Sequence, residues 1–145
     1  MSFIQEIKEM EKDRREKEND VINEIVNYFN EKFNDVKYEE YLKKRIEEEI
    51  NASKKQLNLK IEFWNYSSGC MSTNFSCGGK VFKLEYGKYD YKGIELYDIQ
   101  HKVCDKLSIL LCNKLEELGL TIVSKTRHDN EYRYDYHNEK IVVSW

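Results

Sequence analysis

Proline is absent from the sequence, and alanine occurs once, at Ala52. Lys, Asn, Ile, Glu and Tyr, which have AT-rich codons, are abundant instead, and this bias indicates a low-GC bacterium or one of its phages or plasmids. No apolar run approaches the roughly 20 residues that a membrane-spanning helix needs. Charges separate the first apolar residues, which argues against a secretory signal. We therefore expect a protein of the bacterial cytoplasm.

An excess of basic residues is also missing. The formal net charge is −3, whereas chains that bind nucleic acid usually carry a basic segment. The densest basic group, Lys43, Lys44 and Arg45, lies between glutamates at helical spacing, which indicates a solvated helix face. These observations disfavour nucleic acid as the partner.

The four cysteines lack the close pairs, such as CxxC, that are typical of a zinc site. Cys104 and Cys112 belong to one helical pattern, in which their separation is about 12 Å along the axis and too long for one metal ion. We interpret the cysteines as reduced structural thiols. The sequence therefore predicts no metal and no cofactor.

No group of residues has the pattern of a catalytic site. His101 lies one helical turn from Cys104, but two neighbours on one helix rarely converge for nucleophilic catalysis, so we interpret His101 as an exposed helix histidine. His137 falls beside a predicted turn at Asn138 and Glu139, and polar turn composition explains it without a function. We therefore assign no catalytic residue.

Residues 1–53 are predicted to form a helical N-terminal region. Ser2 and Gln5 fit a capping box, so the first helix should begin at Phe3. A break is expected at Asn34-Asp35, and a second helix follows on an apolar stripe of spacing four.

Residues 54–145 have the pattern of an α+β body. Alternating apolar residues from Leu57 to Phe63 predict a strand, and Gly78-Gly79 predicts a hairpin turn rather than a phosphate-binding loop. Residues 94–118 keep the helical period and should form the central core helix. Three short strands should follow, at 120–126, at 132–136 with Tyr132, Tyr134 and Tyr136 on the inner face, and at 141–145.

The predicted fold class is therefore α+β. Two N-terminal helices precede an antiparallel sheet of five to six strands, which packs on one long central helix. Because the hairpins are sequential, we expect a meander. The helical region and the body should form one compact unit.

The first helix has a gap in its apolar stripe. Ile4, Ile7 and Met10 share one face, residues 11–20 contain no apolar side chain, and the stripe resumes at Ile22. A helix that is polar all round cannot pack into its own core, so residues 11–20 should bridge through solvent. We expect the three apolar residues to bind another protein, with a homo-oligomer through the same helix as the alternative.

Aromatic residues between 64 and 93 form a second candidate surface. Tyr66, Tyr89 and Tyr91 stand among Ser, Asn and Gly, a composition typical of recognition loops, although tyrosines at the rim of an ordinary hairpin fit it equally well. A nucleotide site is a further alternative, because residues 80–97 offer rings for base stacking and lysines for phosphates. Its residues would be Phe82, Tyr86, Lys88 and Lys92.

The resulting hypothesis is a non-catalytic protein-binding module. A small acidic chain without catalytic residues suits an inhibitor, either a phage or plasmid antagonist of a host defence complex or an immunity protein against a toxin. The alternative is a protein that binds or sequesters a small nucleotide or nucleic acid through residues 80–97. An enzyme based on His101 and Cys104 is the least favoured hypothesis.

Overall fold

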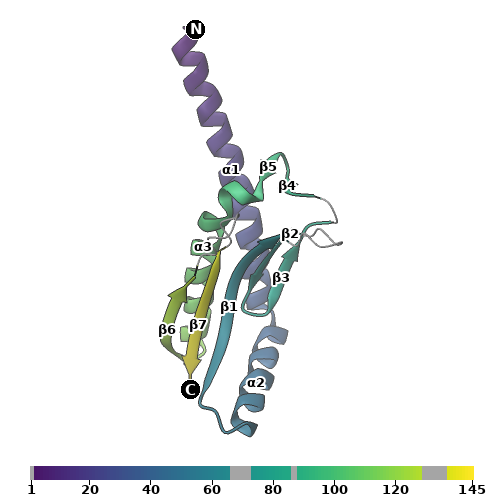
Figure 1. The fold of residues 1–145 in the computed structure, drawn as a ribbon, viewed down its shortest axis with the longest axis vertical. Helices are drawn as coiled ribbons and strands as arrows, with labels where there is room; N and C mark the ends of the chain where they lie inside the picture. The colour runs from purple at the N-terminus through teal and green to yellow at the C-terminus, as the bar shows by residue number, and fades with distance from the viewer. Residues whose placement is uncertain (1, 66–72, 86–87, 129–136) are drawn as a thin grey trace.

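The computed structural model describes residues 2–65, 73–85, 88–128 and 137–145 and has the predicted α+β architecture (Figure 1). The helices are α1 (Phe3–Asn34), α2 (Val36–Asn51) and α3 (Leu96–Glu117). The main strands are β1 (Gln56–Asn65), β2 (Thr73–Cys77), β3 (Lys80–Lys83), β6 (Thr121–Arg127) and β7 (Asn138–Ser144). A short hairpin of β4 (Asp90–Tyr91) and β5 (Ile94–Glu95) precedes α3.

Side-chain caps set the ends of the first two helices. Ser2 Oγ accepts a hydrogen bond from the Gln5 amide at 3.2 Å, and Gln5 Oε1 accepts one from the Ser2 amide at 3.0 Å, which completes the predicted capping box. Asp35 separates α1 from α2 and accepts a hydrogen bond from the Lys37 amide at 3.0 Å. Both helices therefore begin where the sequence predicts.

The five-stranded sheet is antiparallel, with the strand order β3-β2-β1-β7-β6. The expected meander is wrong, because β7 returns after α3 to pair with β1 along Gln56–Glu62. Within the described residues β6 pairs directly with β7. The strand predicted at 132–136, with its three tyrosines, lies outside the described residues.

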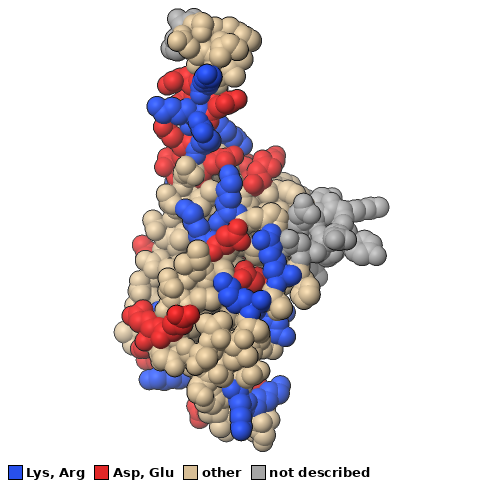
Figure 2. Space-filling model, turned by 90° about the vertical axis from the view of Figure 1, so that its left-hand side faces the viewer, with Lys and Arg blue, Asp and Glu red and all other residues tan. Residues whose placement is uncertain are grey.

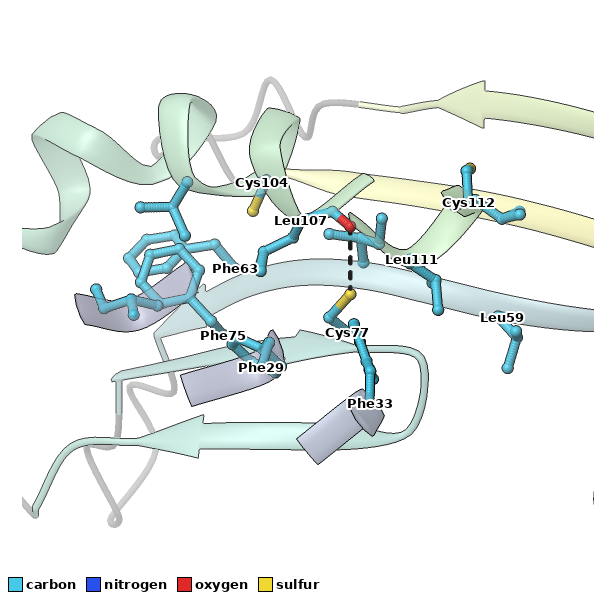
Figure 3. Close-up of a cluster of buried hydrophobic side chains, with 14 of the residues drawn as sticks. Phe29, Phe33, Leu59, Phe63, Phe75, Cys77, Cys104, Leu107, Leu111 and Cys112 are labelled. Carbon is cyan, nitrogen blue, oxygen red and sulfur yellow. Dashed lines mark hydrogen bonds between the residues drawn. The ribbon is translucent and has the colours of Figure 1, made fainter. Parts of the chain in front are cut away.

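The core lies between one face of the sheet and the helices α1 and α3 (Figure 3), and α2 adds Tyr38 and Leu42 to it. The alternating residues of β1 that were predicted to face inward are buried, as are Phe29, Phe33 and Phe75. Phe63 and Phe75 meet with ring centroids 4.8 Å apart. Cys77 Sγ donates a weak hydrogen bond to the Leu107 carbonyl at 3.8 Å, and burial raises the pKa of this thiol.

Among the described helices, none combines the length and apolarity that crossing a bilayer requires.

Candidate functional sites

The N-terminal half of α1 extends beyond the rest of the molecule (Figure 1). The buried residues of this helix begin only at Val21, and residues 3–20 span about 27 Å at 1.5 Å per residue. Contacts with the body begin at Arg14, whose Nη1 donates to the Gly93 carbonyl at 3.4 Å. Glu18 then pairs with Lys102 at 3.7 Å. The solvent bridge is therefore shorter than the predicted 11–20.

Residues 3–13, which we call the N-terminal arm, make no hydrogen bond or ion pair to the body within the described part of the chain. Phe3 is 74% exposed, Ile4 57% and Met10 68%, and Ile7 is partly exposed. At 100° per residue these four side chains share a sector of about 120°. Figure 2 shows an uncharged tip next to a belt of both charge signs. The arm thus presents an amphipathic helix end.

The predicted recognition loop is only partly placed. Tyr66 lies outside the described residues, whereas Tyr89 is 40% exposed. Tyr91 is half-buried and donates a hydrogen bond to Glu24 Oε1 at 2.8 Å, and Lys92 donates to the same oxygen at 2.9 Å. The hydrogen bonds from these two donors hold the pKa of Glu24 below its usual range, and the bond from Lys92 has the larger effect. Tyr91 therefore ties the β4–β5 hairpin to α1.

The residues of the nucleotide alternative gather around a cavity of about 440 Å³. Phe82 lies there edge-on against Tyr91, with ring centroids 5.6 Å apart. Lys88 pairs with Glu85 at 3.4 Å, and Lys92 with Glu24 at 2.9 Å. Tyr86 lies outside the described residues. The cavity lining therefore combines rings with lysines: Phe82, Lys83, Lys88, Tyr91 and Lys92, beside Leu84, Glu85 and Asp90.

A buried polar network between α3 and β7 is a site that the sequence analysis missed. His137 is fully buried and Glu139 is 7% exposed, so the predicted polar turn at these positions is wrong. Ser108 Oγ donates to Glu139 Oε1 at 2.9 Å, and the His137 amide donates to Gln100 Oε1 at 3.1 Å. His101 Nδ1 lies 3.0 Å from His137 Nδ1. His101 is therefore part of this network and not a solvated helix histidine.

The hydrogen bonds of the network constrain its protons. Arg127 always donates, and its Nη2 lies 2.7 Å from His101 Nδ1, so this ring nitrogen accepts. His137 Nδ1 must then carry the hydrogen that it shares with His101. His137 Nε2 lies 3.4 Å from Glu139 Oε2 and bonds to the carboxylate when it too carries a proton. His137 can therefore take up one proton in a buried setting.

Protonation of His137 should make the stability of the fold depend on pH. Burial lowers the pKa of His137, against a smaller upward effect of the Glu139 hydrogen bond. The unfolded chain, with an imidazole pKa of about 6.5, therefore binds more protons than the folded chain. The contribution of neutral His137 to stability is complete above about pH 6.5 and is lost as the pH falls through that value to the folded pKa.

We expect urea unfolding midpoints to fall between about pH 7.5 and 5.5, and His137→Gln to flatten this dependence. NMR titration of the ring provides the direct measurement. A His137 pKa at or above that of free imidazole would contradict the prediction.

The cysteines and acidic residues provide no metal site in the described part of the chain. No group of three or more His, Cys, Asp or Glu side chains there could hold an ion. Cys77, Cys104 and Cys112 are buried thiols, as interpreted from the sequence, and Cys70 lies outside the described residues.

Comparison of the chain with protein-family models, with curated proteins and with solved structures finds no match.

Proposed function

We propose that this chain is a non-catalytic binding protein that docks its N-terminal arm into an apolar groove of another protein. The observation that carries the proposal is the exposure of Phe3, Ile4 and Met10 on one face of a helix that extends past its own body. Amphipathic helices bind grooves through apolar anchors at this spacing. The mixed charges around the arm would form the polar rim of such an interface (Figure 2).

The size of the apolar face favours a partner's groove over a second copy. Full burial of four such side chains contributes about 6–12 kcal/mol before the cost of association, so micromolar binding, which needs about 8 kcal/mol net, also requires contacts from the charged residues around the arm. Two arms crossing at Ile7 would bury only a short stretch of helix, less than the roughly 800 Å² per partner of a standard interface. A groove, which surrounds the helix, buries more of the same side chains.

An inhibitor is the type of binding protein that we favour. The small acidic chain and its composition suit an antagonist of a host defence complex or an immunity protein against a toxin. In both cases an exposed helix would occupy a functional groove of the target. The proposal therefore places Ile4, Ile7 and Met10 in the interface, together with Phe3.

Paired substitutions on opposite faces of the arm test the proposal. Ile4→Asn with Ile7→Asn removes apolar anchors, while Glu9→Asn with Asp13→Asn changes the opposite face by the same residue type. We expect a protein that co-purifies from the native host with the unsubstituted chain to be lost with the first variant and kept with the second. Retention by the Ile4→Asn, Ile7→Asn variant would contradict the proposal.

Sedimentation of the purified chain tests the alternative, in which the arm binds a second copy of the chain. A dimer that the Ile4→Asn, Ile7→Asn variant abolishes would identify a second copy as the occupant of the arm.

The second candidate function is nucleotide binding, which the cavity around Phe82, Lys88 and Lys92 favours. Its weakness is that Lys92 is already held by a close hydrogen-bonded ion pair with Glu24, at 2.9 Å. A nucleotide that binds the folded chain must raise its melting temperature. If no mono-, di- or cyclic nucleotide raises it, this function is excluded.

A further inference from the structure

Among the described residues, one half of β1 has a sheet partner on one side only. β2 pairs with Ile61–Asn65, and the Gly78 amide donates to the Lys60 carbonyl at 3.0 Å where the hairpin turns away. Residues Gln56–Leu59 pair with β7 on the other side. Figure 1 shows this half of β1 continuing past the β2–β3 hairpin, with α2 beside it. The strand therefore has an open edge of four residues, about 13 Å long at 3.3 Å per residue.

The backbone of Asn58 points to this open edge. The Phe63 amide donates to the His137 carbonyl on the β7 side, whereas the Lys60 carbonyl accepts on the β2 side. Backbone groups alternate in direction along an antiparallel strand, so the amide and carbonyl of Asn58 face away from β7. The residue is exposed. An edge of this kind is a template for an added strand.

A basic groove runs along the open edge. A cavity of about 590 Å³ lies between α2 and β1. Arg45 forms part of the α2 wall and donates from Nη1 to the Tyr41 hydroxyl at 3.0 Å. The lining contains four cations and one carboxylate in a chain whose net charge is −3: Arg45, Lys54, Lys55 and Lys60 against Glu49, with Gln56 and Asn58 between them.

The cations of the groove are available to a ligand. Arg45, Lys54 and Lys60 pair with Glu48, Glu49 and Glu62 at 3.8, 3.8 and 3.6 Å. Such solvent-exposed pairs contribute little, so an incoming carboxylate can replace them.

We propose that the open edge of β1 binds an extended acidic peptide segment, which adds to the sheet as a strand beside Gln56–Leu59. The Asn58 backbone supplies the ladder hydrogen bonds, and the lysines with Arg45 select acidic side chains. A second copy of the chain is disfavoured as the occupant, because pairing two such edges would bring together two grooves with the same basic lining. The site does not involve the N-terminal arm.

The test uses the full chain and the fluorescent peptide acetyl-Asp-Val-Glu-Val-Asp-Val-amide. Asn58→Pro removes the amide that faces the groove without removing a bond to β7, whereas Asn58→Ala keeps it. We expect the peptide to bind the unsubstituted chain and Asn58→Ala alike, and Asn58→Pro at least about tenfold more weakly, or about 1.4 kcal/mol. Equal binding to Asn58→Pro, or no binding to the unsubstituted chain, would overturn the proposal.

Charge variants keep the test decisive if Asn58→Pro does not fold. Lys55→Glu with Lys60→Glu should also weaken the acidic peptide, and the analogue with Lys in place of Asp and Glu should bind the unsubstituted chain less tightly. An oligothymidylate that displaces the peptide with higher affinity would assign the groove to nucleic acid instead. Ile4→Asn with Ile7→Asn should leave peptide binding unchanged, so this site and the arm are tested separately.

Discussion

Replacing Glu139 with alanine is expected to lower the free energy of unfolding by about 2 kcal/mol. The side chain is 7% exposed and accepts from Ser108 Oγ at 2.9 Å, and it lies 3.4 Å from His137 Nε2. Its removal leaves the buried Ser108 hydroxyl without its acceptor. The desolvation of this hydroxyl then remains uncompensated. Urea denaturation at constant pH measures the loss.

Glu62 provides the matched control for Glu139. It lies on the opposite face of the sheet, where it pairs with Lys60 at 3.6 Å and its side chain is 27% exposed. Glu62→Ala should cost less than about 1 kcal/mol, as surface ion pairs do. A double-mutant cycle of Glu139→Ala with Ser108→Ala should show coupling of at least about 0.5 kcal/mol. Equal costs for Glu139→Ala and Glu62→Ala would show that the network does not stabilise the fold.

The sequence predicts the local structure of this chain well because local chemistry sets it. The capping box at Ser2, the break at Asp35 and the turn at Gly78-Gly79 are each specified by neighbouring residues. The arm is predictable for the same reason, since the lack of apolar side chains in residues 11–20 separates Ile4, Ile7 and Met10 from the rest of the apolar stripe. Its function as a docking element stays a prediction.

The buried network and the strand order depend on long-range pairing and could not be derived from local patterns. His101 and His137 are 36 positions apart, and each resembles an ordinary polar residue in its own segment. The polar neighbours of Glu139 indicate a turn, although Ile141 and Val143 continue its inward-facing alternation. Extending that alternation backwards from Val143 would have placed Glu139 in the core. The open edge of β1 depends on the register in which β2 pairs with β1, with Cys77 opposite Ile61, and no local signal reveals this register.

A second large loss of stability is expected for Gly79→Ala, in the hairpin turn beside the groove. Gly79 has a φ of +91°, where a side chain costs about 1–2 kcal/mol. A Cβ there would also lie 2.6 Å from Tyr41 Cζ, and overpacking costs about 1–3 kcal/mol. We expect a total loss of about 3 kcal/mol in the free energy of unfolding, measured by urea denaturation.

Gly93 separates the two causes of this loss. Its φ is +81°, but a Cβ there would meet nothing within 4 Å, so Gly93→Ala should show the backbone cost alone, about 1 kcal/mol. In a Tyr41→Ala background, Gly79→Ala should approach that smaller value. If Gly79→Ala costs no more than Gly93→Ala, the packing of Tyr41 against the turn is not tight.

The same substitution connects the turn to the proposed strand-addition site. Tyr41 stacks on buried Tyr38 with ring centroids 5.9 Å apart, and its hydroxyl holds Arg45 at 3.0 Å in the groove wall. A side chain at Gly79 must push Tyr41 aside and so shift Arg45. Gly79→Ala should therefore weaken the acidic peptide, whereas Gly93→Ala should leave it bound. Because both variants carry the backbone strain, a difference in affinity between them would report the position of Arg45.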